Sequence, residues 1–233
     1  MNNDLNSNDL RIIERIEGFP ASESEPRLSH KLMNKYEMLP LSRIYGKYLC
    51  LVKYGILKIT RIDNDGSERI RYLVGKGGFL GEFSIFESAG FADAYEDAYA
   101  RVLEPCWIQF ISMEKIKRAM ISSSDVRDFM LSLVVKKIRI YERLYERMLI
   151  RDVRLRVMGF LMEVAREFGT LHEDVYTLNN FLTHEDIASA VNSTRQTVTK
   201  ILNELREKGF IEYNVYFLKI ILREDEKCTE ACQ

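Results

Sequence analysis

The spacing of hydrophobic and polar residues changes along the chain and predicts two kinds of structure. Between residues 31 and 112, short apolar runs alternate with turns. The strongest turn is Asn64-Asp65-Gly66, because these residues tolerate the positive φ of a hairpin. Several short strands at this spacing indicate a compact antiparallel barrel or roll. Residues 1–30 are polar and weakly patterned, so we expect a tail with one helical turn near residues 10–16.

A long helical pattern begins near residue 123 and contains no glycine or proline up to residue 150. Its apolar residues advance in steps of three and four, which is the a/d spacing of a coiled coil. This predicted seam comprises Leu131, Val134, Ile138, Tyr141, Tyr145 and Met148. A second apolar set lies on another face, so we expect the helix to meet a second copy on one side and the roll on the other. A single buried helix within one domain is the alternative.

Residues 182–209 predict two short helices joined by a sharp turn. Thr183 and Asp186 have the spacing of a capping box, and Asn192 falls where the turn requires a left-handed backbone. The second helix would bury apolar residues at helical spacing, namely Val198, Ile201, Leu202 and Leu205. This pattern is typical of a helix-turn-helix, and the alternation over residues 210–220 predicts a two-stranded wing after it.

The exposed face of the second helix carries side chains that suit the edges of DNA bases. Arg195 suits the O6/N7 edge of guanine, Gln196 suits the N6/N7 edge of adenine, and Lys200 reaches guanine or a phosphate. Hydroxyl groups near the helix N-termini suit backbone phosphates. The predicted DNA-contacting residues are Arg195, Gln196, Thr199, Lys200, Thr183, Thr194 and Thr197. An ordinary helical hairpin with solvated polar faces is the alternative.

Charge supports DNA binding only locally. The net charge of the chain is −1, so the chain as a whole has no electrostatic signature of a nucleic-acid-binding protein. Residues 136–156 carry eight basic and three acidic residues, and eight minus three gives a local charge of +5. A DNA-bound dimer could use some of these basic residues near a hinge at residues 151–153.

In order along the chain, these features resemble the cyclic-AMP receptor protein/fumarate-nitrate regulator (Crp-Fnr) superfamily of bacterial transcription regulators. The resemblance is carried by the long helix, Asp152 and the stretches 52–55 (VKYG), 64–66 (NDG), 78–83 (GFLGEF) and 187–202 (IASAVNSTRQTVTKIL). It implies an α+β fold with an N-terminal antiparallel, cyclic-nucleotide-binding-like β-roll, a long dimerisation helix and a C-terminal winged helix-turn-helix. It also implies a cytoplasmic homodimer that binds a palindromic promoter site and contacts RNA polymerase, as an activator does.

In that family, the positions of Arg195, Gln196 and Lys200 read bases, and two of the three differ here. Gln196 stands where the family usually has an acidic residue, and Lys200 stands where it has an arginine. An acidic side chain accepts a hydrogen bond from cytosine, whereas glutamine pairs with adenine. We therefore predict a half-site different from that of the cyclic-AMP receptor protein, with adenine opposite Gln196.

The same resemblance places an effector site in the roll but argues against a cyclic nucleotide. Members that bind cyclic AMP hold the ribose with a Gly-Glu pair, present here as Gly81-Glu82, and the phosphate with an Arg-Ser pair, which aligns with about Glu96-Asp97. Residues 82–104 carry six acids and one base, Arg101, so a phosphate would meet a local charge of −5. We predict a neutral or aromatic small molecule as the effector. A cation and the absence of any ligand are the alternatives.

The predicted effector site comprises Phe79, Leu80, Gly81, Glu82, Phe83, Tyr95, Tyr99, Ile138 and Tyr141. Core packing is the alternative explanation for each of its aromatic residues, and Glu82 could instead be a structural cap. The three histidines lack the spacing of metal ligands, so we predict no metal site.

The predicted domains are a polar tail over residues 1–30, an effector-sensing β-roll over 31–122, a dimerisation helix over 123–151, a winged helix-turn-helix over 152–226 and a tail over 227–233. Two rival functions stay open: a redox-sensing regulator that uses Cys228 and Cys232, and a β-roll module that regulates a protein partner without DNA. The sequence has no Ser/His/Asp set, P-loop or HExxH motif and no apolar run long enough for a bilayer, so we expect neither an enzyme nor a membrane protein.

Overall fold

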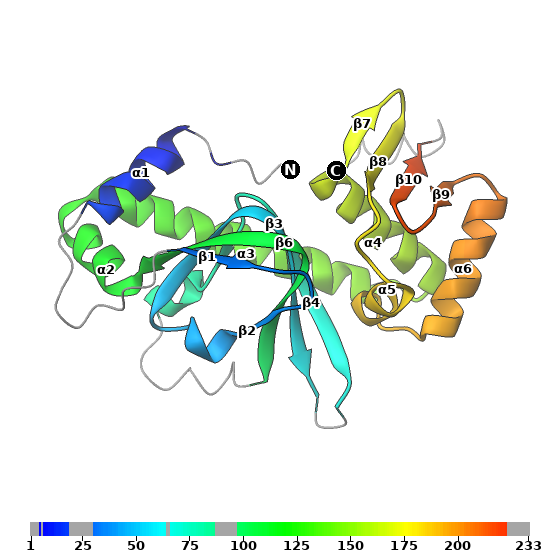
Figure 1. The fold of residues 1–233 in the computed structure, drawn as a ribbon, viewed down its shortest axis with the longest axis horizontal. Helices are drawn as coiled ribbons and strands as arrows, with labels where there is room; N and C mark the ends of the chain where they lie inside the picture. Colours follow the sequence, from blue (N-terminus) through cyan, green and yellow to red (C-terminus); the bar gives the residue numbers. More distant parts are fainter. Residues whose placement is uncertain (1–4, 6, 19–29, 64–65, 87–96, 223–233) are drawn as a thin grey trace. The chain divides into compact units, whose positions relative to one another are not determined.

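The computed structural model describes residues 5, 7–18, 30–63, 66–86 and 97–222. The chain forms two compact units, and the boundary between them falls within one long helix, after Leu144 (Figure 1). Within the described residues, no helix is long and apolar enough to cross a bilayer.

The unit that ends at Leu144 contains the predicted roll. Its antiparallel sheet consists of β1 (His30–Met33), β2 (Met38–Pro40), β3 (Tyr48–Ile62), β4 (Glu68–Val74), β5 (Phe79–Leu80) and β6 (Ala98–Ser112), with short 3-10 helices η1 (Leu41–Arg43) and η2 (Glu82–Ile85). The long strands β3 and β6 pair with each other; β1 and β2 add to β6, and β4 and β5 add to β3. Alternate residues of β3 and β6, such as Leu57, Ile59, Ala100 and Val102, meet in the core of the roll.

Gly55 permits a close approach of β3 to β6. Its φ of +90° lies in the left-handed region, and a Cβ at this position would lie 2.1 Å from the carbonyl oxygen of Pro105 and 2.6 Å from Sγ of Cys106. The pairing register of the two strands shifts on either side of this point. Only glycine therefore fits where the two longest strands bend together.

A second hydrophobic cluster lies under three helices, α1 (Ser7–Glu17), α2 (Met113–Ser122) and α3 (Ser124–Leu149). Ile12, Ile13 and Ile16 of α1 are buried in it. The prediction of a polar tail with a single helical turn is therefore wrong for Ser7–Glu17. Three isoleucines spaced by one and three residues form a narrow apolar stripe, which is enough to hold an eleven-residue amphipathic helix against the core.

The long helix α3 presents different apolar faces. Ile140, Tyr141 and Leu144 pack against the core of the roll. Four residues of the predicted seam are instead exposed, namely Leu131 (56%), Ile138 (46%), Tyr145 (64%) and Met148 (62%). Val134 is half-buried. Of the six predicted seam residues, Tyr141 is the one that packs on the roll.

The unit that begins at Tyr145 contains α4 (Val153–Phe168), β7 (Thr170–His172), β8 (Val175–Asn179), α5 (His184–Ala190), α6 (Arg195–Glu207), β9 (Ile211–Tyr213) and β10 (Phe217–Ile221). Its antiparallel sheet has the order β7-β8-β10-β9. The predicted helix pair is confirmed, as is the predicted wing, formed by β9 and β10. The β7–β8 hairpin was not predicted, because its strands are short and residues 170–179 are largely polar.

Candidate nucleic-acid interface

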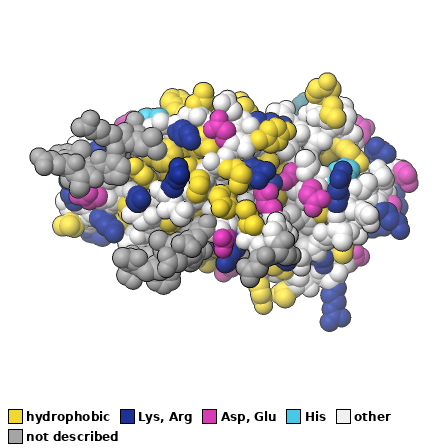
Figure 2. Space-filling view, turned by 60° about the horizontal axis from the view of Figure 1, so that its bottom comes forward, with side chains coloured by type: hydrophobic (Ala, Val, Ile, Leu, Met, Phe, Trp, Pro, Cys, Tyr) yellow, Lys and Arg dark blue, Asp and Glu magenta, His cyan; other side chains and the backbone are white. Residues whose placement is uncertain are grey.

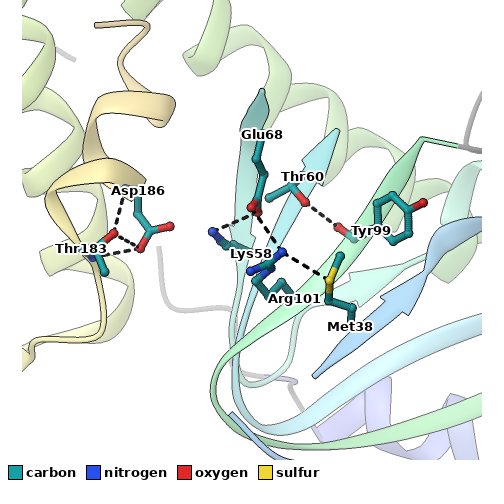
Figure 3. Close-up of polar contacts among 8 residues, drawn as sticks. All are labelled: Met38, Lys58, Thr60, Glu68, Tyr99, Arg101, Thr183 and Asp186. Atoms are coloured by element: carbon teal, nitrogen blue, oxygen red, sulfur yellow. Dashed lines mark hydrogen bonds and ion pairs between the residues drawn. The ribbon is translucent and has the colours of Figure 1, made fainter. Parts of the chain in front are cut away.

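The first helix of the helix-turn-helix, α5, begins with a complete capping box. Oγ1 of Thr183 accepts a hydrogen bond from the backbone N–H of Asp186 at 3.1 Å, and Oδ2 of Asp186 accepts one from the backbone N–H of Thr183 at 2.9 Å (Figure 3). Two N–H groups without intrahelical partners are thereby satisfied. Ile187 and Ala188 are buried, which anchors the inner face of this short helix.

The turn before the second helix takes the conformation that the sequence predicts. Asn192 has a φ of +50°, in the left-handed region. Thr194 then caps α6, because its Oγ1 accepts a hydrogen bond from the backbone N–H of Thr197 at 3.2 Å. The start of α6 is therefore fixed by local chemistry on both sides of the turn.

Helix α6 buries one face and leaves the predicted base-reading face open. Val198, Ile201, Leu202 and Leu205 are buried, whereas Arg195, Gln196 and Lys200 are exposed. An open hollow of about 780 Å³ runs along this face. It is lined by Thr194, Arg195, Gln196, Thr199, Lys200, Asn203, Glu204 and Glu207. The wing strand β9 lies beside α6 (Figure 1). The two are joined by a hydrogen bond in which Oη of Tyr213 donates to Oδ1 of Asn203 at 3.2 Å.

Thr199 differs from the other predicted contacts because its hydroxyl is engaged within the protein. Its Oγ1 donates to the carbonyl oxygen of Arg195 at 2.8 Å, and Nδ1 of His184 lies 2.8 Å from the same Oγ1. A hydroxyl has one proton, so Nδ1 of His184 is the donor when Thr199 binds Arg195. Burial lowers the pKa of His184 below its ordinary value, and the nearby charge of Arg195 lowers that pKa further.

The other predicted phosphate contacts lie at the starts of the two helices. Thr183, Thr194 and Thr197 are exposed, and the hydroxyl oxygens of Thr194 and Thr197 lie 2.9 Å apart. The structure thus brings together all the predicted DNA-contacting residues of α6 and its cap on one surface. Lys and Arg side chains are interspersed with Asp and Glu over the face drawn in Figure 2, in keeping with the low net charge.

Three arginines of the basic stretch 136–156 bind groups within the protein, and the sequence did not predict these contacts. Arg147, at the end of α3, pairs with Glu163 and lies 5.1 Å from the centre of the Phe160 ring. Arg154 pairs with Glu204 and joins α4 to α6. Arg156 donates to backbone carbonyls, among them that of Val191 at 2.9 Å. Their partners lie in other helices or turns, so residue spacing alone could not reveal these contacts.

In the roll, Glu82 is engaged by a lysine of the long helix. Nζ of Lys137 lies 3.0 Å from Oε1 of Glu82, donates to the carbonyl oxygen of Phe79 at 3.2 Å, and sits 4.1 Å from the centre of the Tyr72 ring. The side chains of Lys137 and Glu82 are only 6% and 2% exposed. Burial raises the pKa of Tyr72, and Glu82 raises that pKa further, so the Tyr72 hydroxyl stays protonated.

The structure brings together only part of the predicted effector site. Phe83 stacks on Tyr141 with ring centroids 6.3 Å apart, near Glu82 at the start of η2. Gly81 precedes η2 with a φ of +90°, and Leu80 lies in the roll core. Tyr99 and Ile138 lie elsewhere: Tyr99 alternates with core residues Ala98 and Ala100, and Ile138 is on the exposed seam. Phe79 lies beside Glu82, and its ring packs on Phe129. Tyr95 lies outside the described residues.

The hollow next to Glu82 and Lys137 is small. The described residues enclose about 40 Å³ there, whereas sites for small molecules usually measure about 300–1,000 Å³. Phe79, Gly78, Leu133 and Ile140 also line it.

Arg101, the one base near the expected phosphate site, is directed elsewhere. Its Nη2 lies 3.5 Å from Oε2 of Glu68 and 3.3 Å from Sδ of Met38, and Lys58 pairs with the other oxygen of Glu68 (Figure 3). Its neighbours Ala100 and Val102 are in the roll core, so Arg101 lies on the opposite face of β6.

The two cysteines within the described residues are buried and free. Burial raises the pKa of Cys106 to about 12 and raises that of Cys50 as well. Both are therefore protonated and unreactive in the folded chain. Cys228 and Cys232 lie outside the described residues.

Comparison with known proteins identifies the family of both units. A cyclic nucleotide-binding domain matches residues 44–123, and a Crp-like helix-turn-helix domain matches residues 155–226. The chain is 30% identical over 172 residues to the global nitrogen regulator of Synechococcus elongatus, covering 74% of each chain. It is 25% identical over 168 residues to the CRP-like cAMP-activated global transcriptional regulator of Mycobacterium tuberculosis, covering 71% of this chain and 72% of that one.

Solved structures agree in fold. FixK2 from Bradyrhizobium japonicum has a TM-score of 0.71 at 15% identity and matches 86% of this chain and 96% of its own. A cyclic nucleotide-binding domain containing protein from Listeria monocytogenes has a TM-score of 0.72 at 19% identity, covering 92% and 98%. Together, the two matched domains, the order of the elements and the relative at 30% identity show that this chain belongs to the Crp/Fnr family of transcription regulators.

Proposed function

We propose that the chain acts in the cytoplasm as an effector-responsive homodimer that reads a palindromic promoter site with α6 of each copy. One observation carries this proposal: Arg195, Gln196 and Lys200 form an exposed polar ridge on a helix whose opposite face is buried. A recognition helix held in this way presents the N-terminal half of its outer face to a major groove. Contact with RNA polymerase belongs to the proposal through family membership.

The ridge makes a specific prediction about sequence preference. Gln196 offers an acceptor and a donor that match adenine, whereas a carboxylate at this position would accept from cytosine N4. We expect Gln196→Glu to change the preferred base at one position of each half-site from adenine to cytosine. Arg195→Ala should weaken binding by about 1–3 kcal/mol and relax the preference for guanine.

Selection of duplexes from a randomised pool, performed with the full-length chain and each variant, tests both expectations. Arg166→Ala is a matched control, because Arg166 is an exposed arginine in the last turn of α4 and is not part of the ridge. If Arg195→Ala and Gln196→Glu selected the same duplexes as the unchanged chain, the ridge would not read bases. That result would favour the rival in which the roll regulates a protein partner.

Dimerisation through α3 is part of the proposal. The exposed residues Leu131, Ile138 and Tyr145 are spaced by seven and lie on one stripe, while Ile140 and Leu144 are already occupied by the roll. An exposed apolar stripe of this length on a helix is the type of surface that a second copy covers.

The effector that we propose is a small molecule other than a cyclic nucleotide. Glu82, the residue that holds ribose in cyclic-AMP-binding members, is engaged here by Lys137 at 3.0 Å. Arg101 lies on the opposite face of its strand, and Asp97 aligns with the Arg-Ser pair that would hold the phosphate.

Thermal unfolding with and without millimolar cyclic AMP tests this part. A ligand that binds the folded state raises the unfolding midpoint, so we expect no shift with cyclic AMP. Native mass spectrometry of the chain as purified should instead reveal any retained small molecule. A clear upward shift with cyclic AMP that Glu82→Gln abolishes would contradict the proposal.

A further inference from the structure

Arg156 joins two separate backbone segments with one side chain. Its Nη1 donates to the carbonyl oxygens of Ile150 at 2.7 Å and Arg151 at 3.2 Å, in the segment between α3 and α4. Its Nε donates to the carbonyl oxygen of Val191 at 2.9 Å, and its Nη2 donates to that of Asn192 at 3.4 Å, in the turn before α6. All four acceptors are main-chain atoms.

The chemistry of the two segments explains why an arginine is needed. Each follows the C-terminal end of a helix, α3 or α5, where carbonyl groups lack intrahelical partners and the helix dipole is negative. A guanidinium spreads five N–H donors over a rigid planar fork, so it can bind acceptors on two sides at once. A lysine in this place would keep the positive charge. Its three N–H donors share one nitrogen, however, so they would not span both segments.

We propose that Arg156 is a positioning residue that ties the turn before the recognition helix to the segment joining α3 to α4. The inference rests on the proposed DNA-binding function. The turn at Asn192 determines where Thr194 caps α6, and α6 carries Arg195 and Gln196. A displacement of the carbonyls of residues 150–151 therefore reaches the base-reading side chains through one planar group. Recognition depends on placement within about 0.5 Å, so the link sets whether the ridge is correctly placed.

DNA binding distinguishes positioning from a direct phosphate contact. Full-length Arg156→Ala, Arg156→Lys and the control Arg166→Ala are compared with the unchanged chain by fluorescence anisotropy at several salt concentrations. The probes are a duplex selected by the unchanged chain from a randomised pool and a random-sequence duplex of equal length. We expect both Arg156 variants to bind the selected duplex about tenfold or more weakly, with the random duplex and the salt slope unchanged.

Three outcomes of that experiment, performed together with thermal unfolding of each variant, overturn the inference. A direct phosphate contact at Arg156 would weaken both duplexes equally and reduce the salt slope by about one in Arg156→Ala, with recovery in Arg156→Lys. Unchanged affinity for the selected duplex would show that the link does not position the ridge. A purely structural role would lower the unfolding temperature without altering the ratio of selected to random binding.

Hydrogen exchange of the full-length chain without DNA gives a second, independent measurement. In both Arg156 variants, we expect faster exchange in residues 150–152 and also in residues 191–194, with the middle of α4 still protected. Faster exchange in only one of the two segments would overturn the link. If the unchanged chain selected no duplex, the proposed function would fail, and hydrogen exchange alone would decide the role of Arg156. Arg156→Lys keeps the charge and so covers the case in which Arg156→Ala does not fold.

Discussion

At the scale of single residues, His184 connects the start of α5 to the base-reading helix. Its Nδ1 lies 2.8 Å from Oγ1 of Thr199, and its ring packs edge-on against Tyr213 at 5.8 Å. Burial and, to a lesser extent, Arg195 lower the pKa of His184, so the folded state favours the neutral ring. Protonation of His184 keeps the Nδ1–H donor to Thr199, but it places a positive charge in a partly buried site beside Arg195 and so opposes the folded arrangement of α5 and α6.

We expect acidification to loosen α5 and α6. The unfolded chain has the ordinary histidine pKa of about 6.5, so it takes up the proton before the folded chain does. The stability due to neutral His184 is complete above that pH and is lost as the pH falls below it. His184→Asn keeps a donor in the place of Nδ1 and does not titrate. It should therefore lose less hydrogen-exchange protection in α5 and α6 when the pH is lowered from about 7.5 to about 5.5.

His172→Asn provides the matched control, because His172 is exposed in β7 of the same unit. It should respond to acid as the unchanged chain does. Equal loss of protection in His184→Asn and the unchanged chain would show that another group is responsible.

The sequence predicts which residues of a helix are exposed, because helical spacing determines this. It does not predict contacts with residues that are far away along the chain. Arg195, Gln196 and Lys200 follow from helical spacing, because a buried face on a helix defines its exposed face. Lys137 is also a helical residue, but its partners Glu82 and Phe79 come from the roll more than fifty residues earlier. Hydrophobic periodicity carries no information about such a pair. The local charge count therefore included Lys137 among the basic residues available to DNA.

At the scale of elements, the bend where β3 meets β6 depends on Gly55. We expect Gly55→Ala to destabilise the roll severely. The positive φ costs an alanine about 1–2 kcal/mol, and the added Cβ would overlap the carbonyl oxygen of Pro105, a backbone atom that cannot move without shifting β6. Thermal unfolding of the full-length chain measures the loss.

Gly159→Ala is the matched control for this substitution. A Cβ at Gly159 would meet no atom within 4 Å outside its own helix, and alanine favours the interior of α4 by about 1 kcal/mol over glycine. It should leave the midpoint unchanged or raise it. If both alanine variants unfolded at the same temperature, close approach at Gly55 would not be limiting.

The elements with strong periodicity were predicted with nearly correct bounds, and the weakly patterned ones were missed. Helix α6 buries Val198, Ile201, Leu202 and Leu205, as their spacing indicated, and the turn before it is at Asn192, where it was predicted. The hairpin β7–β8 was missed because Thr170–His172 is fully exposed and gains its order from pairing with β8. The length of helix α1 was underestimated, because its isoleucines are stabilised by packing in a hydrophobic cluster with residues of α2 and α3.

At the scale of the whole molecule, the exposed stripe of α3 predicts the oligomeric state. We expect Ile138→Asp to convert the chain to a monomer, because carboxylates from two copies would repel and lose their hydration in the same apolar seam. Sedimentation velocity measures the change. Arg139→Asp is the control, because Arg139 is exposed next to the stripe on the same helix. An Ile138→Asp chain that sediments as the unchanged chain does would place any dimer contact elsewhere.

Basic side chains that bind groups of their own chain are less available to the DNA of a chromosome. Four of the eight basic residues between 136 and 156, namely Lys137, Arg147, Arg154 and Arg156, bind groups of their own chain. Attraction to arbitrary stretches of a genome comes almost entirely from free cations, so we expect these four side chains to add little to the binding of irrelevant sequence.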